Sequence, residues 1–168
     1  FDSHWALLDS ANFGVPQKRS RAFLVALLRN ETKPLEWPDI VDEPRPTVAA
    51  AIGDLMAENG WKGISDWMEK ASFPAPTIVG GSLKHGGPDL GPTRARREWA
   101  ELGVDGLGLA NEPPGPDFVG MPRLTTRMVA RLQSFPDDWE FIGSKTQVYR
   151  QVGNALPVGL ATAIGKTL

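Results

Sequence analysis

The stretch NFGVPQKRSRAFLVALL, residues 12–28, joins a polar turn to a continuous apolar run. Gly14 and Pro16 are typical of a turn, and residues 22–28 have the length of a β-strand. A strand without alternating polar residues is usually buried on both faces inside a larger sheet. Few other segments of the chain resemble strands. We therefore expect the sheet to extend beyond this chain.

The composition is that of one ordinary globular domain. The chain has 168 residues, of which 41% are hydrophobic and 23% are charged. Its 18 glycines and 15 prolines exceed the usual share and predict long, ordered loops. No apolar run approaches the roughly 18 residues that span a bilayer, and no signal peptide is recognisable. We therefore expect a cytoplasmic protein.

Charge and residue types exclude several classes of site. The formal net charge of −2 and the pI near 5.7 give no bulk support for nucleic-acid binding, although a local basic patch is compatible with it. The absence of cysteine excludes disulfides, cysteine-ligated metals and a cysteine nucleophile within this chain. Because His4 and His85 lie far apart in the sequence, no protein metal site is expected.

The middle of the chain predicts short helices joined by loops. Thr47 caps a helix that ends at Gly60, and residues 30–46 have the composition of a linker. Further expected elements are a helix end and turn over 1–12, a short helix or turn over 61–70, a strand over 75–81, a glycine-rich loop over 80–97 and helical turns over 97–103. Near the end, Thr125 or Thr126 caps a helix that runs to Gln133, and Pro157 suits the first turn of a last helix.

Three segments together resemble motifs of the cytosine-5 DNA methyltransferase family. NFGVPQKRSRAFLVAL resembles its Gln-x-Arg-x-Arg motif, RLTTRMVARLQSFPDDW its Arg-Leu-Gln-Gly-Phe-Pro-Asp motif, and YRQVGNALPVGLATAIG its Gly-Asn-Ala/Ser motif. Their order and spacing match the family, with roughly ninety residues of variable sequence between the first two motifs. In the family, that interval holds the target-recognition region.

The resemblance implies an α/β fold, in which a fragment of a Rossmann-like methyltransferase sheet joins a small, loop-rich mixed target-recognition domain. We expect residues 1–30 to end the catalytic domain and residues 31–122 to form the target-recognition domain. Residues 123–147 would form a supporting helix and hinge, and residues 148–168 a helix that returns to the catalytic domain. The family's Pro-Cys nucleophile, Glu-Asn-Val carboxylate and Gly-rich cofactor loop lie upstream of these motifs and are absent from this sequence.

The implied reaction is methyl transfer from S-adenosylmethionine to C5 of a cytosine flipped out of duplex DNA, after a cysteine thiolate has added to C6. The resemblance implies that Arg21 faces the flipped base, that Arg19 supports the pocket or a phosphate, and that Gln17 belongs to the same catalytic group. Arginine suits this task because its planar cation binds pairs of oxygens and does not deprotonate. Without the resemblance, Arg19 and Arg21 are better explained as solvated charges before a strand.

The same resemblance gives a cofactor site. Gly153, Asn154 and Ala155 precede the N-terminus of the last helix, where backbone N–H groups and an amide side chain can hold a carboxylate. They would therefore bind the methionine carboxylate of S-adenosylmethionine. The alternative is that Asn154 is a helix cap and nothing more.

DNA contacts are expected from the middle of the chain. Thr77 and Ile78 stand where the family has its recognition dipeptide. The loop over 80–97 is expected to enter the major groove with its basic side chains, which are Lys84, His85, Arg94, Arg96 and Arg97. An ordinary solvated glycine-rich loop is the alternative.

Two positions depart from the family pattern, and several others are expected to be structural. Met128 stands where the family often has Glu, which removes a capping partner, and Ser134 replaces a Gly whose turn favours positive φ. Arg131 is expected to bond loop carbonyls. The expected core residues are Leu132, Phe135, Trp139 and, more generally, the tryptophans.

The sequence therefore predicts the C-terminal part of a DNA cytosine-5 methyltransferase, which is inactive alone. Its expected partners are double-stranded DNA and the N-terminal catalytic half, supplied by the same protein or by a separate subunit. Two alternatives are a DNA-binding specificity module without catalysis and a degenerate remnant that acts as a folding or interaction partner. By family resemblance, the protein is expected near the nucleoid of a prokaryote.

Overall fold

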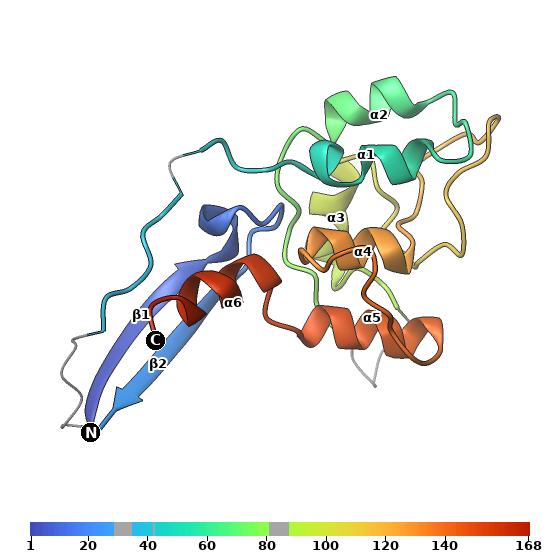
Figure 1. Ribbon diagram of the computed structural model, residues 1–168. Coiled ribbons are helices and arrows are strands. Elements are labelled where there is room, and N and C mark those ends of the chain that lie inside the picture. Colours follow the sequence, from blue (N-terminus) through green and yellow to red (C-terminus); the bar gives the residue numbers. More distant parts are fainter. Residues whose placement is uncertain (29–34, 42, 81–87) are drawn as a thin grey trace.

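A computed structural model describes residues 1–28, 35–41, 43–80 and 88–168. The fold is α/β, and Figure 1 shows a long hairpin with one helix on it at one end and a group of helices at the other. The elements, in order, are β1 (Asp2–Asp9), η1 (Ser10–Phe13), β2 (Ser20–Leu27), α1 (Val48–Ala57), α2 (Ile64–Lys70), α3 (Thr93–Glu101), α4 (Thr126–Leu132), α5 (Lys145–Asn154) and α6 (Val158–Gly165).

The N-terminal segment is a strand, which corrects the expected helix end over residues 1–12. β1 pairs with β2 in antiparallel register, with Trp5 opposite Leu24 and Leu7 opposite Ala22. The connection turns through η1 and through Gly14, whose φ of 74° is left-handed. The apolar pattern of residues 2–9 does not alternate regularly, so it does not by itself indicate a strand. Pairing with β2 fixes the extended conformation of these residues.

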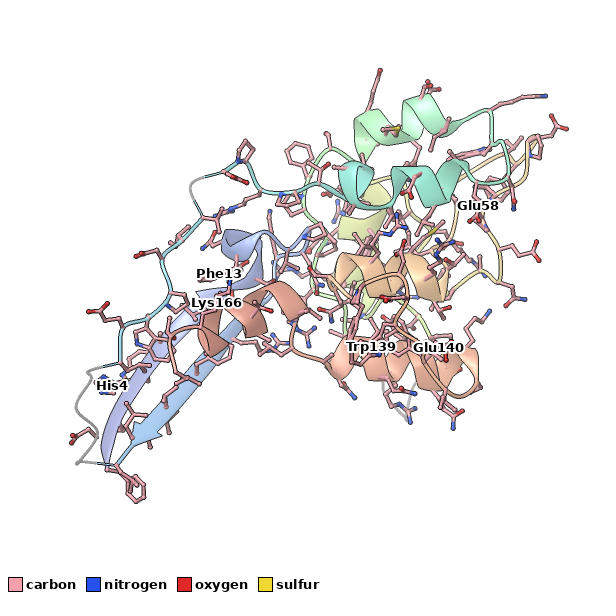
Figure 2. The ribbon with its side chains drawn as sticks, in the orientation of Figure 1. His4, Phe13, Glu58, Trp139, Glu140 and Lys166 are labelled. Atoms are coloured by element: carbon pink, nitrogen blue, oxygen red, sulfur yellow. The ribbon has the colours of Figure 1, made fainter. Side chains whose placement is uncertain are left out.

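Among the residues that the structure describes, the hairpin is covered on one face only. Leu8 and Phe23 pack against Phe13, Leu160 and Ile164, so that α6 lies on this side of the strands (Figure 2). On the other face, large apolar side chains remain open to solvent. Their exposed fractions are 75% for Trp5, 67% for Leu7 and 74% for Leu24. The expected strand is confirmed, but within this chain β2 is buried on one face and not on two.

The main hydrophobic core lies among the helices. α1 packs against α2 and α4, and α4 packs against α5. The largest fully buried apolar side chains here are those of Ile52, Met56, Ile78, Leu90, Trp99, Leu124, Met128, Leu132 and Tyr149. Trp61, Trp67 and Trp99 are core residues as expected. The expected core position is wrong for Trp5 and Trp139. Trp139 lies on the loop between α4 and α5 and is 55% exposed (Figure 2).

Two predicted helix caps are confirmed. The Thr47 hydroxyl accepts a hydrogen bond from Ala50 N at 3.1 Å and begins α1. The Thr125 hydroxyl accepts one from Met128 N at 3.3 Å, while the Met128 sulfur accepts one from Thr125 N at 3.4 Å. The thioether thus takes the place of the expected carboxylate in a reciprocal cap, with a weaker acceptor.

Other boundaries differ from the expectation. α3 begins at Thr93, so the predicted loop over 80–97 ends earlier. The end of the chain forms two helices, α5 and α6, with a break at Ala155 and Pro157. Residues 75–80 form no strand, because their pairing is limited to one parallel bridge between Ala75 and Gln17.

Ser134 is the one non-glycine residue with positive φ in the described ranges, at 63°. It ends α4 in the turn where the family pattern has Gly. Left-handed backbone costs a residue with a Cβ roughly 1–2 kcal/mol, whereas Gly adopts it freely but loses more entropy on folding. The turn therefore keeps its geometry and carries strain.

We predict that Ser134→Gly stabilises the fold by about 0.5 kcal/mol, since relief of the left-handed strain exceeds the entropy cost of Gly. Chemical denaturation of the two proteins at the same pH measures this difference. A matched Ser144→Gly change at the start of α5, where φ is −66°, should destabilise instead. Destabilisation by Ser134→Gly would contradict the proposed strain.

Candidate functional site

Two segments that are distant in the sequence run side by side at the junction of hairpin and helices. Ala75 N donates to Pro16 O at 2.9 Å, and Lys18 N donates to Ala75 O at 2.8 Å. The Thr77 hydroxyl donates to Lys18 O at 2.7 Å. These bonds hold residues 16–19 against residues 75–78, so the Gln-x-Arg motif lies directly beside the expected recognition dipeptide.

Gln17 is a fully buried polar side chain that joins three parts of the chain. Its amide oxygen accepts a hydrogen bond from Ile78 N at 2.9 Å, and its amide nitrogen donates to Leu132 O at 3.3 Å. Its own carbonyl accepts from the Ser10 hydroxyl at 2.6 Å. Because both ends of the amide are used inside the protein, this side chain supports the site from within.

Arg19 is also buried, with only 4% of its surface exposed. One terminal nitrogen donates to Ile78 O at 2.5 Å and the other donates to Gly153 O at 2.8 Å. Burial, with the nearby charge of Arg21, lowers the pKa of Arg19 to about 10, so the group stays cationic at neutral pH. In the part of the chain that the structure describes, it is held by carbonyl oxygens and by no carboxylate.

Arg21 differs from Arg19 because it lies on β2 and is partly exposed. One of its terminal nitrogens donates to the carbonyl of Ser20 at 2.8 Å. Its remaining donors have no partner among the described residues. The two arginines of the motif therefore have different environments, with Arg19 enclosed and Arg21 able to meet a ligand.

The expected cofactor residues lie at the end of α5. Ala155 N donates to Gln151 O and Val152 O, both at 3.2 Å, and Val158 N donates to Gln133 O at 3.2 Å. These two backbone donors are already used within the protein, and the expected carboxylate contact of Gly153, Asn154 and Ala155 stays a prediction. The Asn154 side chain is exposed and makes no hydrogen bond to the described residues. Its amide fits one end of a cofactor carboxylate.

Two glycines cross at this point without room for side chains. A Cβ on Gly153 would lie 2.5 Å from the Cα and 2.6 Å from the N of Gly80. A Cβ on Gly80 would lie 2.3 Å from the side-chain oxygen of Asn154. The backbone that leads out of segment 75–80 therefore rests on the end of α5, beside Asn154.

The expected DNA-binding residues separate into three groups. Thr77 is partly exposed at the junction. Ile78 is fully buried in the core, so its side chain has no access to DNA and the expected contact is corrected to a packing role. Lys84 and His85 lie outside the described residues. The remaining candidates, Arg94, Arg96 and Arg97, are on α3 and not in a loop.

On α3, Arg94 and Arg97 are exposed, whereas Arg96 is partly covered. Arg94 pairs with Glu98 at 3.2 Å with 92% of its side chain exposed, so this ion pair constrains it little. Arg96 donates to the Thr93 hydroxyl at 3.3 Å. The helix thus carries a small basic surface that is compatible with phosphate contacts.

Sequence reasoning did not single out two buried polar residues of this junction. Gln133 donates from its amide to Val152 O at 2.9 Å and accepts from Val158 N through its carbonyl. Ser10 bonds the carbonyl of Gln17. A signal for Gln133 exists, because it follows Val129 by four residues and so falls on the apolar face of its helix. Ser10 has no such signal.

Arg131 has the structural role that was expected, although carboxylates are its principal partners. It bonds both oxygens of Asp54 at 2.5 and 2.6 Å, pairs with Asp137 and reaches Ala51 O at 3.4 Å. Hydrogen bonds from Arg131 lower the pKa of both Asp54 and Asp137. The network ties α1 to α4 and to the Phe-Pro-Asp-Asp turn.

The described residues offer neither a metal site nor a membrane span. Within the described ranges, no cluster of three or more His, Cys, Asp or Glu side chains is arranged to hold a metal ion. None of the described helices is long and apolar enough to cross a membrane.

Comparison with known proteins assigns the chain to a family. The sequence model of the C-5 cytosine-specific DNA methylase family matches residues 1–168. The type II methyltransferase M.NaeI of Lentzea aerocolonigenes is 52% identical over 169 residues, which cover 99% of this chain and 41% of that protein. M.NgoMIV of Neisseria gonorrhoeae is 42% identical, over 98% of this chain and 53% of that protein. The chain spans about half the length of these relatives.

A solved structure shares the fold. The crystal structure of the S. pombe Dnmt2 methyltransferase superimposes with a TM-score of 0.56 and covers 98% of this chain and 56% of that one. Sequence identity is 18%, so the likeness concerns the fold alone.

The Arg131 network predicts an acid-sensitive contribution to stability. An Asp with a lowered folded pKa stabilises the fold above its unfolded pKa, about 3.9, and this contribution is lost as the pH falls through the folded value. We expect Arg131→Gln to lose about 1 kcal/mol or less near neutral pH and to show a shallower loss of stability below about pH 4. Denaturant unfolding between pH 7 and pH 2.5 measures both.

The matched control is Arg45→Gln, because Arg45 donates to the Asn12 amide and has no ion pair with the residues that the structure describes. It should keep the pH dependence of the unaltered chain. Equal acid slopes for Arg131→Gln and the unaltered chain would contradict the assigned role.

Proposed function

The chain belongs to the C-5 cytosine-specific DNA methylase family, and we propose that it is the C-terminal part of a DNA (cytosine-5)-methyltransferase. In this proposal the chain supplies target recognition and one side of the pockets for base and cofactor. The remaining part, in the same protein or in a separate subunit, supplies the catalytic cysteine. The observation that carries the proposal is the family match over residues 1–168, combined with the bare apolar face of the hairpin.

The half-covered hairpin supports an incomplete catalytic sheet. Trp5, Leu7 and Leu24 form an apolar surface on β1 and β2, opposite the face that α6 covers. In α/β folds, the central sheet is usually covered by other elements on both faces. The N-terminal catalytic half would cover this surface, and the strands would join its sheet.

The polar residues of the junction have distinct proposed roles in methyl transfer. S-adenosylmethionine is the methyl donor that this family uses. Arg21, with donors free among the described residues, would hold the flipped cytosine as charge develops on its ring. Gln17 and Arg19 would position Arg21 and the neighbouring backbone, because both are buried and bonded to carbonyls. The Asn154 amide, next to Gly153 and Ala155, would hold the carboxylate end of the cofactor.

DNA recognition is assigned to residues 31–122. Thr77 lies at the junction, and Arg94 and Arg97 are exposed on α3, where they would bind phosphates or guanine edges. Contacts by Arg96, Lys84 and His85 stay predictions. The boundaries of the expected domains, and a cytoplasmic, nucleoid-associated location in a prokaryote, also stay predictions. M.NaeI and M.NgoMIV are type II methyltransferases by name, and the description of the family as a DNA methylase supports DNA as the substrate.

We predict that the isolated chain transfers no methyl group, because it has no cysteine. Co-expression with the N-terminal half should restore transfer of labelled methyl groups to duplex DNA. In that assembly, Arg21→Ala should lower kcat/KM by about 100-fold, whereas Arg45→Ala should leave it unchanged. Association of the halves without any methyl transfer would support the alternative of a non-catalytic specificity module.

We also predict that the isolated chain associates through its bare sheet face. It should bind a hydrophobic dye and form concentration-dependent oligomers in sedimentation experiments. Leu24→Lys should reduce both and block assembly with the N-terminal half, since a charge would be buried there. Val119→Lys is the matched control, because Val119 is 91% exposed and lies away from the hairpin. A monomer with low dye binding would contradict the prediction.

A further inference from the structure

We propose that Arg19 is a positioning residue that couples recognition of the DNA target to binding of the cofactor. The inference rests on the proposed function, and concerns how its two binding regions communicate. Arg19 is buried and would act through the backbone that it holds. It bonds the carbonyl of Ile78, in the expected recognition segment, and the carbonyl of Gly153, next to the expected cofactor residue Asn154.

The geometry needs an arginine. The two terminal nitrogens of one planar guanidinium reach two carbonyls that are 75 residues apart in the sequence, at 2.5 and 2.8 Å. A lysine ammonium carries its donors on a single atom and cannot present this fixed fork. A buried cation without a carboxylate partner is unfavourable unless hydrogen bonds compensate its lost hydration. Arg19 is only 4% exposed, so its two carbonyl bonds must offset the loss of hydration. We infer from this cost that the bridge between the two segments serves the function.

The two glycines beside Arg19 bring the same segments into direct contact. At Gly153, an added Cβ would meet backbone atoms, 2.5 Å from the Gly80 Cα and 2.9 Å from the Val79 carbonyl carbon. At Gly80, it would meet the end of the Asn154 side chain at 2.3 Å. Any displacement of residues 78–80 on DNA binding is therefore transmitted to Asn154 by contact.

Neighbouring bonds keep this contact stiff. Gln17 fixes Ile78 N, and Gln133 fixes the carbonyl of Val152, the residue before Gly153. With both backbones held, Arg19 sets the distance between them. Two sites linked through one shared contact have a coupling free energy, and each ligand then changes the affinity of the other by the same factor.

The test measures that factor in the complete methyltransferase that contains this chain. The dissociation constant of its substrate duplex is determined with and without saturating S-adenosylhomocysteine, a stable cofactor analogue. We expect the analogue to tighten DNA binding by a factor within the usual range of roughly 5 to 150. Arg19→Lys should bring this factor to near 1, whereas Arg123→Lys, at an exposed ion pair with Asp105, should preserve it.

Glycine variants give an independent arm that leaves the buried cation in place. Gly153→Ala should also abolish the factor, because its clash is with backbone. Gly80→Ala, whose clash is with a side-chain end, should reduce it and weaken analogue binding. Gly165→Ala in α6 has open space and should change nothing. Circular dichroism and melting curves identify variants that fail to fold, and the folded variants decide.

The outcomes are distinct. A factor of 1 in the unaltered enzyme, or an unchanged factor in folded Arg19→Lys or in Gly80→Ala, overturns the coupling. Loss of overall affinity with a preserved factor also overturns it, since that result indicates a structural role alone. Failure of the unaltered enzyme to methylate DNA would instead refute the proposed function.

Discussion

The junction depends on one buried guanidinium. Arg19 bonds Ile78 O and Gly153 O, and through them joins the turn before β2 to segment 75–80 and to the end of α5. Gln17 and Gln133 add bonds to the carbonyls of Leu132 and Val152. All three motif segments that resemble the methyltransferase family therefore meet through polar side chains whose partners are backbone carbonyls. Such bonds require a defined backbone path, so they specify geometry more than they add stability.

The hairpin imposes the second constraint. α6 covers the face that contains Leu8 and Phe23, and the opposite face presents Trp5, Leu7 and Leu24 to solvent. An apolar sheet face of this kind is costly in water, and burial against a further layer is the usual solution. The fold therefore combines a closed helical core with an open sheet face. The partly exposed Arg21 on β2 and the exposed Asn154 at the end of α5 belong to the proposed pockets near the junction of these two parts.

Local features of the sequence were predictable and distant ones were not. The caps at Thr47 and Thr125 follow from the residues themselves, as does the strand around residues 22–28. β1 was missed because pairing with β2 fixes it. The burial of Ile78 arises from residues far away in sequence, so the local pattern does not reveal it. The start of α3 before Arg94 also has no local signal, because its N-cap is Pro92, which makes no side-chain cap bond. Which of the two motif arginines is enclosed depends on the carbonyls of Ile78 and Gly153, and no pattern within the motif encodes that.

In the proposed function, this chain forms one side of a sheet and of a pocket whose other side is the N-terminal catalytic half. Hydrogen–deuterium exchange of the chain, free and assembled with that half, tests this most directly. Peptides of β1 and β2 should gain protection on assembly, together with the end of α5, while α1 and α2 should keep the exchange rates of the free chain. Unchanged exchange in both strands on verified assembly would contradict the claim.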